Sequence, residues 1–233
     1  MPDPQDPEFL FQQQELFTRI SQRYDLANHI MTGWQDNRWR RYAIKKLQLP
    51  PSAQLLDIGS GNGQLVQQTL ELHPDSNPIA ADLTQTMIEV GQLRDKTNQI
   101  NWTLSDSACL PFPDLYFDAV ISGFLLRNLS DIIQGLQEQY RVLKPGGRIA
   151  VLDTSKPPPH LLSPLIRLYM KRIMPAIGGL LSGYKKAYTY LNHSTEGFLR
   201  AEELAAYLAA VGFKEVAYKQ FAFGVIAVHW GRK

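Results

Sequence analysis

The sequence predicts an α/β fold: a Rossmann-like, mainly parallel sheet with an antiparallel C-terminal strand and an N-terminal helical cap. Two observations carry this prediction. Short apolar runs alternate with helical patterns as far as residue 153, and the last apolar segments form a hairpin pattern. Such alternation is typical of parallel strands joined by crossover helices. We expect a single domain over 1–233, with the cap at 1–50, the core at 51–233 and a helical insertion at about 157–190.

The cap and the first strands follow directly from these patterns. Residues 9–48 predict two or three helices, because apolar residues recur at roughly helical spacing before the LPPS segment stops them. Strands are predicted for QLLDIG, IAAD, INWTL, FDAVISG and RIAVLD. Helices are expected from about Gly63, after Thr84 and from Asp131.

The last third of the chain changes pattern. Residues 144–147, KPGG, predict a structural turn between a helix and a strand. After Asp153 the alternation breaks at SKPPPH, and a long amphipathic region follows. A helix at about 201–210 and the hairpin VAYKQFAFGVIAVHW close the chain. The hairpin gives the sheet an antiparallel strand, which differs from the all-parallel sheet of dehydrogenases.

Composition excludes several classes of protein. The 24 basic and 22 acidic residues leave a net charge of +2, without the strong positive field that drives nucleic-acid binding. Cys109 is the single cysteine, so no intrachain disulfide forms, and no Cys/His spacing resembles a metal site. The N-terminus lacks a secretory signal pattern, and charges interrupt the apolar stretch 161–184. We therefore expect a cytoplasmic protein with no transmembrane helix, no metal and no nucleic-acid partner.

The segment LLDIGSGNGQL is the sharpest local signal. Asp57 ends a strand pattern that runs into Gly59, Gly61 and Gly63 just before a helix. Glycines let a ligand approach the backbone, and a helix N-terminus offers free N–H groups. A dinucleotide motif would place its third glycine at position 64, which is Gln64, so a nicotinamide enzyme is disfavoured. S-adenosylmethionine (SAM) carries no phosphate, and an acid beside the turn suits its amino or hydroxyl groups. The alternative is a glycine-rich turn that merely connects strand to helix.

Further cofactor candidates follow the next two strands. Asp82 ends the second strand pattern, where a carboxylate can accept hydrogen bonds from both ribose hydroxyls. Alternatively Asp82, or Thr84, caps the helix that follows. Asp106 and Ser107 follow the third strand and either hold the adenine amino group or form a local turn. Met87 either packs on the adenine or belongs to the core.

Taken together, these segments resemble class I methyltransferases and, more narrowly, the ubiquinone/menaquinone biosynthesis C-methyltransferases of the UbiE type. The resemblance is carried by RYDLANHIMTGWQDNRWRR, LLDIGSGNGQL, ADLTQTM, ACLPFPDLYFDAV, GFLLRNLSD, YRVLKPGGRIAVLDTSKP, YLNHSTEGFLRAEEL and GVIAVHWG. It implies the class I methyltransferase sheet and SAM as cofactor. The residues that it assigns to SAM are Gly59, Gly61, Asn62, Asp82, Asp106 and Ser107, with Tyr24 near the cofactor under an N-terminal lid.

The resemblance also implies a substrate. Members of the family methylate a ring carbon of a quinol with a long isoprenoid tail, which implies a lipophilic quinol partner and contact with the inner face of the membrane. The chain departs from the family at Gly123 and Leu125, because SGFLLRN stands where the family reads SFGLRN. A serine near SAM is thereby lost, although Ser122 is adjacent, and we expect Ser122 and Gly123 to be among the cofactor-binding residues.

A second departure lies toward the predicted substrate pocket. The chain reads YLNHSTEGFL where the family reads YLPESIRRFP, so His193 replaces a glutamate, and Glu196 and Gly197 replace two arginines. Methylation of a quinol carbon is helped by a base that takes a phenolic proton. Three candidates are His193, Asp153 and Tyr188, each of which has a purely structural alternative.

Other readings stay open at this point. Arg127 and Asn128 either position the substrate or cap the helix that follows. The acceptor is a quinol or another lipid-like or small aromatic molecule, including a phospholipid amine, and a non-catalytic SAM-binding scaffold is a further alternative. Basic and apolar residues mix over 161–186, which predicts either weak membrane association or an amphipathic helix facing the core. The sequence leaves the oligomeric state undetermined.

Overall fold

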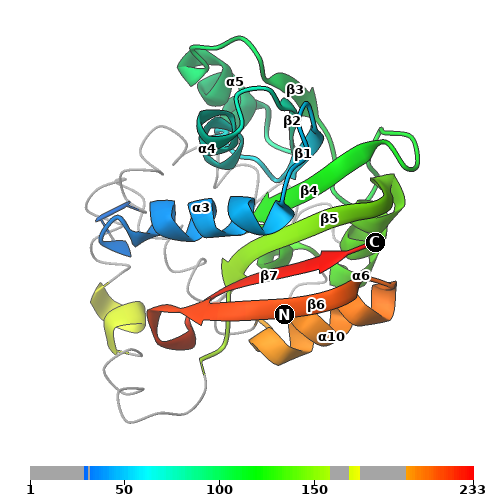
Figure 1. Cartoon of the computed structure of the whole chain (residues 1–233). Helices are drawn as coiled ribbons and strands as arrows, with labels where there is room; N and C mark the ends of the chain where they lie inside the picture. The colour runs from blue at the N-terminus through cyan, green and yellow to red at the C-terminus, as the bar shows by residue number, and fades with distance from the viewer. Residues whose placement is uncertain (1–28, 31, 158–167, 174–197) are drawn as a thin grey trace.

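The computed structural model describes residues 29–30, 32–157, 168–173 and 198–233. This part of the chain contains a seven-stranded sheet of order β3-β2-β1-β4-β5-β7-β6 (Figure 1). The strands are β1 (Gln54–Ile58), β2 (Asn77–Asp82), β3 (Asn101–Leu104), β4 (Phe117–Gly123), β5 (Leu143–Thr154), β6 (Lys214–Phe221) and β7 (Ile226–Arg232). Strand β7 is antiparallel to both of its neighbours, whereas the pairs from β3 to β5 are parallel. The predicted mixed sheet is confirmed.

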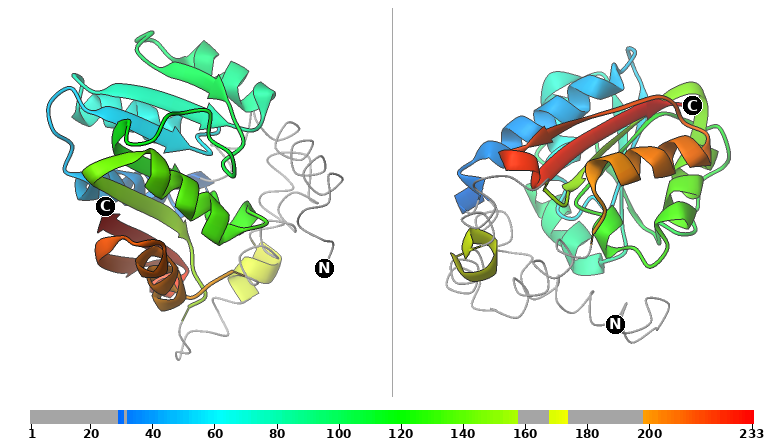
Figure 2. Two further views of the ribbon diagram at one scale, coloured as in Figure 1. Left: turned by 90° about the vertical axis from the view of Figure 1, so that its right-hand side faces the viewer. Right: turned by 90° about the horizontal axis from the view of Figure 1, so that it is seen from below.

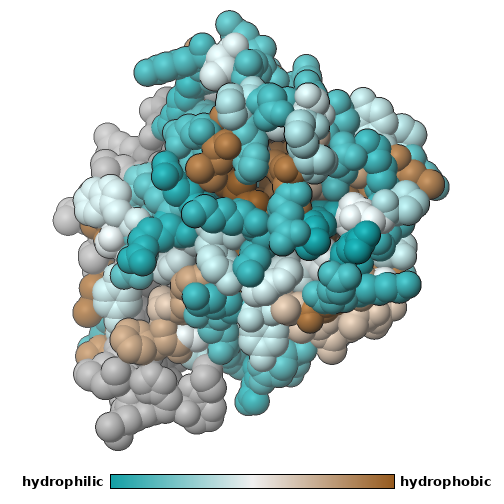
Figure 3. Space-filling view, viewed as in Figure 1, coloured by the Kyte–Doolittle hydropathy of each residue, from teal (hydrophilic) through white to brown (hydrophobic). Residues whose placement is uncertain are grey.

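Helices cover both faces of this sheet. They are α3 (Gln35–Leu47), α4 (Gln64–Leu72), α5 (Gln85–Arg94), α6 (Ile132–Val142) and α10 (Ala201–Val211). Helix α3 packs across β4, β5 and β7 beside α4, while α6 and α10 pack together on the opposite face (Figure 2). The short helical segments are η1 (Leu126–Asn128), η2 (Tyr169–Ile173) and η3 (Ala222–Gly224). The face that carries α3 is mostly hydrophilic (Figure 3).

The central strands are apolar because helices exclude water from both of their faces. Leu55 and Leu56 are neighbours on β1 and are both fully buried, one in the core on each side of the sheet. Phe117 and Ile121 of β4 are equally buried. The continuous apolar runs of the sequence therefore mark strands at the centre of the sheet.

Local capping fixes where two helices begin. The Asp131 carboxylate accepts a hydrogen bond from the Gln134 N–H at 2.9 Å and so caps α6. The alternative that Arg127 or Asn128 caps this helix is wrong, because both lie in η1. At α10, the Arg200 N–H donates to Glu203 Oε2 at 2.7 Å.

The predicted KPGG turn lies inside β5 instead of before it. Pairing with β4 jumps from Leu143 to Arg148, so residues 144–147 bulge out of that ladder. They nevertheless continue the sheet on the other side, because the Gly146 N–H donates to the Lys233 carbonyl and the Lys233 N–H to the Gly147 carbonyl, both at 2.9 Å. Hydrogen bonds to Lys233 therefore make residues 144–147 part of a strand, where the sequence predicted a turn.

Two predicted segments fall largely outside the described residues. Of the cap at 1–50, the structure describes α3 and the short stretch before it. Of the insertion at about 157–190, it describes residue 157 and residues 168–173, which include η2. Among the described helices, none is long and apolar enough to cross a membrane.

Candidate functional site

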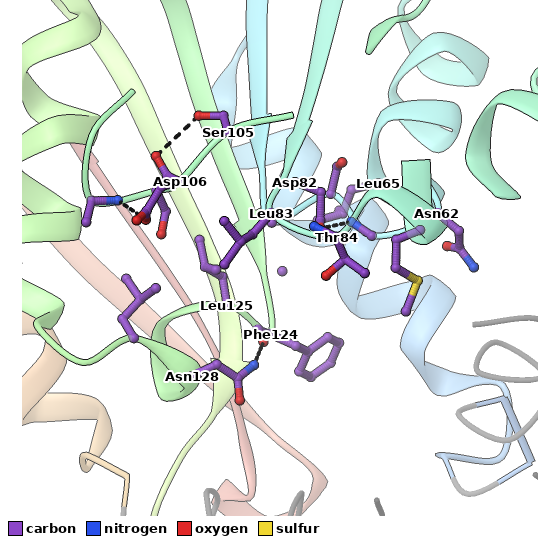
Figure 4. A pocket seen from close by; sticks show the side chains of 18 of the residues that line it. Asn62, Leu65, Asp82, Leu83, Thr84, Ser105, Asp106, Phe124, Leu125 and Asn128 are labelled. Atoms are coloured by element: carbon purple, nitrogen blue, oxygen red, sulfur yellow. Dashed lines mark hydrogen bonds between the residues drawn. The ribbon is translucent and has the colours of Figure 1, made fainter. Parts of the chain in front are cut away.

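A pocket opens at the carboxyl edge of the sheet, where the loops after four neighbouring strands meet (Figure 4). The strand order reverses between β1 and β4, and ligands of open α/β sheets bind at such a switch point. Strand β1 contributes the turn that begins at Gly59, and β2 contributes the segment from Asp82 to Met87. Residues 105–108 follow β3, residues from Gly123 follow β4, and Arg40 of α3 completes the lining.

The glycine turn depends on its glycines for two reasons. Gly59, Gly61 and Gly63 have φ values of +64°, +57° and +81°, a region that side chains disfavour. A Cβ at Gly59 would lie 2.7 Å from Leu125 Cδ1, and one at Gly63 would lie 2.5 Å from the Trp102 ring. A Cβ at Gly61 would meet nothing within 4 Å, which fits a position that faces the open pocket.

Asp82 is held in one orientation at the pocket wall. Its Oδ2 accepts the Gly61 N–H at 2.7 Å, and its Oδ1 accepts the Thr84 N–H at 2.8 Å. Burial raises the pKa of Asp82, while these backbone donors lower it. The carboxylate thereby links the end of β2 to the glycine turn.

The opposite side of the pocket is formed by the residues after β3. Asp106 Oδ1 accepts the Ala108 N–H at 2.8 Å, so its carboxylate forms the local turn that was one of the predicted alternatives. Asp106 and the buried Ser107 both line the pocket, as does the buried Met87. Leu83 and Leu125 lie between this side and Asn62 (Figure 4).

Several predicted cofactor residues lie behind the lining instead of on it. Asp57 is fully buried, and burial together with the nearby Asp82 raises its pKa, while the Val66 N–H and Arg40 lower it. Its carboxylate is therefore shielded from the pocket, and Gly63 is also outside the lining. Ser122 is buried and alternates with Gly123 along β4, so only Gly123 faces the pocket.

Asp153 and Arg127 form a second buried group beside the pocket. Arg127 Nε lies 4.0 Å from Asp153 Oδ1, and the Arg127 N–H donates to Oδ2 at 3.3 Å. The Thr154 N–H donates to Oδ1 at 2.7 Å. Burial raises the pKa of Asp153, and Arg127 opposes that rise. Neither residue lines the pocket, whereas Asn128 does and donates to the Phe124 carbonyl at 3.0 Å.

Three predicted residues, Tyr24, Tyr188 and His193, lie outside the described residues. Within the described ranges, no group of three or more His, Cys, Asp or Glu side chains could hold a metal ion.

Arg40 and Phe124 also line the pocket, although the sequence did not predict them as site residues. Phe124 has a φ of +58°, and its ring lies 6.0 Å from the Arg40 guanidinium and 5.2 Å from that of Arg127. Arg40 lies in the helical pattern of the cap and Phe124 directly follows a strand pattern, and neither pattern suggests a binding residue. The spacing of Asp36 and Arg40 by four residues was the one signal that could have singled out Arg40.

Comparison with known proteins identifies the chain. A family model described as the ubiE/COQ5 methyltransferase family matches residues 10–233. The chain belongs to this family. It is therefore a SAM-dependent methyltransferase. The pocket lining offers carboxylates, glycine backbone and one guanidinium, which are groups that can bind the polar parts of SAM.

Relatives of this methyltransferase match over most of their length. A protein of Desulfotalea psychrophila named ubiquinone/menaquinone biosynthesis C-methyltransferase UbiE is 39% identical over 94% of this chain and 89% of its own. A demethylmenaquinone methyltransferase of Thermus thermophilus is 38% identical over 93% of this chain and 99% of its own.

Solved structures of the same fold are more distant. A SAM-dependent methyltransferase of Thermotoga maritima has a TM-score of 0.65 at 20% identity, covering 94% of this chain and 99% of its own. The cyclase SpnF has a TM-score of 0.67 at 16% identity and covers 94% of both chains. A cyclase on this fold illustrates why these similarities establish the fold alone.

Proposed function

We propose that this methyltransferase transfers a methyl group from SAM to a ring carbon of a prenylated quinol, of the demethylmenaquinol type, in quinone biosynthesis. The observation that carries the proposal is the 38–39% identity, over more than nine-tenths of the chain, to relatives whose names specify C-methylation or demethylmenaquinone. The pocket at the carboxyl edge of the sheet supports it with groups suited to the cofactor.

In the proposed site, Asp82 accepts hydrogen bonds from the ribose hydroxyls, since its carboxylate is already fixed by two backbone N–H groups. Asp106 and Ser107 hold the adenine end, against which Met87 packs. Gly59, Gly61 and Asn62 border the rest of the cofactor, with Gly123 at the end of β4. SAM, when bound, supplies an electrophilic methyl group on its sulfonium. The protein then has to hold the acceptor carbon in line with that methyl group.

The acceptor side of the proposed site begins at η1. We assign substrate positioning to Arg127 and Asn128, which adjoin the pocket wall through Phe124. Asp153 already accepts bonds from two backbone N–H groups and is buried, so we assign it to holding Arg127 in place. This leaves His193 and Tyr188 as the candidates for the base that takes the phenolic proton.

Product analysis tests the proposed reaction. The protein is incubated with methyl-labelled SAM and either a reduced prenylated naphthoquinone that lacks the ring methyl or phosphatidylethanolamine. We expect label on a ring carbon of the quinol and none on the phospholipid, and we expect the Asp82→Ala variant to be the inactive control. Label on the phospholipid, or SAM binding without turnover of either acceptor, would reject the proposal.

We also propose weak, reversible contact with anionic membranes through the region 161–186. The described part of this region exposes Leu168, Arg172 and Ile173, a mixture that suits an interfacial surface.

Flotation tests this contact. We expect part of the protein to float with anionic liposomes at low salt, and less of it at high salt or with a Leu168→Glu/Ile173→Glu variant. Absence of the protein from the liposome fraction at low salt would reject the proposed membrane contact but not the proposed reaction.

A further inference from the structure

Arg40 is the one cation among the described residues that line the pocket. The acids of the same lining are Asp82, Asp106 and Asp131. SAM carries one carboxylate on its methionine portion, and that group needs a cationic or N–H partner when it leaves water. Arg40 is buried, with 5% of its surface exposed, so a carboxylate that meets it in the pocket is also shielded from water.

A network on α3 fixes the Arg40 side chain. Arg40 Nη1 donates to Asp36 Oδ2, one helical turn earlier. The same carboxylate oxygen lies 2.7 Å from His29 Nδ1, and Asp36 Oδ1 accepts a hydrogen bond from Thr32 Oγ1 at 3.1 Å. Burial raises the pKa of Asp36, but the charges and hydrogen bonds of Arg40 and His29 together outweigh it, and the pKa is lowered. Asp36 therefore stays ionised and accepts a hydrogen bond from one edge of the guanidinium. The guanidinium has five N–H donors in all, so others remain for a ligand.

Arg40 also lies at the correct end of the pocket for this role. Its guanidinium is 6.0 Å from the Phe124 ring, and its charge acts on the buried Asp57, which precedes the glycine turn in the chain. Asp106, which we assign to the adenine end, lies across Leu83 and Leu125 from Phe124 (Figure 4). A cofactor with its adenine at Asp106 and its ribose at Asp82 directs its methionine portion toward Arg40.

We infer that Arg40, oriented by Asp36, is the residue that binds the methionine carboxylate of SAM in this protein. The inference rests on the proposed placement of SAM in the pocket. Arg40 recognises the carboxylate and not the reacting methyl group, so it selects for the complete amino acid portion of the cofactor.

Calorimetric binding of two ligands tests this role. SAM carries the carboxylate, and decarboxylated SAM lacks it but keeps the adenosine, the sulfonium and the amine. We expect Arg40→Gln to weaken SAM binding at least tenfold, as for loss of one charge-assisted contact, and to change the affinity for decarboxylated SAM less than threefold. Arg40→Lys keeps a charge beside Asp36 without the fork and should weaken SAM binding several-fold, again with little effect on decarboxylated SAM. This second variant tests the inference even if Arg40→Gln does not fold.

Two matched variants separate the possible failures. Arg41→Gln changes the next residue of α3, which is exposed and paired with Glu71, and should alter neither affinity. Asp82→Ala should weaken both ligands equally, since both carry the ribose. If Asp82→Ala weakens both ligands while the Arg40 variants weaken neither, or both alike, Arg40 does not bind the carboxylate. If the Asp82 and Arg40 variants all leave SAM affinity unchanged, the placement of SAM itself is wrong.

Discussion

Two buried Asp–Arg pairs meet at Phe124, and they differ in how tightly the charges are joined. Asp36 and Arg40 are one turn apart on α3 and hydrogen-bonded, and the pKa of Asp36 is lowered. Asp153 and Arg127 lie on different elements with Nε and Oδ1 4.0 Å apart, and burial raises the pKa of Asp153. Arg40 lines the pocket, whereas Arg127 does not.

The difference shows how one combination of residues serves two purposes. A short pair within one helix is set by local geometry, so it presents a fixed guanidinium to a ligand. In the second group, backbone N–H groups of Arg127 and Thr154 donate the hydrogen bonds to Asp153, at 3.3 and 2.7 Å. That carboxylate therefore holds the backbone of Arg127 in η1 and of Thr154 in β5, while the Arg127 guanidinium is joined to it less tightly.

Removing each carboxylate tests this comparison with the largest expected effect. We expect Asp36→Ala to lower the free energy of unfolding by about 3 kcal/mol or more, because it leaves the buried Arg40 without its partner. Asp153→Ala should cost about 2 kcal/mol, mainly through the unsatisfied backbone N–H groups. Urea unfolding of both variants, with the matched Asp→Asn changes as controls, measures the difference. An equal or larger loss for Asp153→Ala would contradict the comparison.

Acid unfolding extends the comparison to a third buried group, His229. Burial lowers the pKa of His229 to about 4, although its Nε2 lies 2.8 Å from the Ala201 carbonyl. The unfolded chain takes up this proton near pH 6.5 and the folded one near pH 4. The stability that neutral His229 contributes is therefore fully present above pH 6.5 and falls by about 3 kcal/mol as the pH drops through this window. His229→Gln should flatten the slope of unfolding free energy against pH there, and an unchanged slope would assign it to other groups.

A His193 variant tests the half of the proposed site that binds the methyl acceptor, next to Arg127. If His193 takes the phenolic proton, His193→Ala should lower kcat for the quinol about a hundredfold, the lower end of general-base effects. A neutral imidazole titrates near working pH and needs no large shift for this role. SAM affinity should persist, and Tyr188→Phe is the parallel variant. Turnover of His193→Ala within a few-fold of the unaltered protein would shift the assignment to Tyr188.

The cofactor side is tested through Asp82. Asp82→Ala should weaken SAM binding at least tenfold, about 1.4 kcal/mol, because the ribose hydroxyls lose a charged acceptor. Thermal unfolding without ligand serves as the control for folding. Unaltered SAM affinity in a folded variant would show that the ribose lies elsewhere.

The sequence predicted those features that short stretches determine. Apolar runs identified the central strands, because a strand covered by helices on both faces has a nearly continuous apolar sequence. The glycine turn and Asp82 were found because a positive φ and a strand-end acid leave local signatures. Nine predicted site residues line the pocket: Gly59, Gly61, Asn62, Asp82, Met87, Asp106, Ser107, Gly123 and Asn128.

The remaining features depend on packing between distant segments. Asp57 is the expected motif acid, yet its pKa is raised by complete burial and by the nearby Asp82, which the sequence of one strand cannot reveal. Arg40 reaches the pocket only because α3 packs across β4 and β5. The KPGG segment belongs to β5 because Gly146 and Gly147 form backbone hydrogen bonds with Lys233, which is distant in the sequence.

Mass spectrometry of the quinones in cells that lack this protein tests the central claim, C-methylation of a prenylated quinol, most directly. We predict that such cells accumulate a quinone lighter by one methylene and lose the methylated form. The intact gene should restore the methylated quinone, and a His193→Ala/Asp82→Ala gene should not. A normal quinone profile in cells without the protein or any functional relative would contradict the claim.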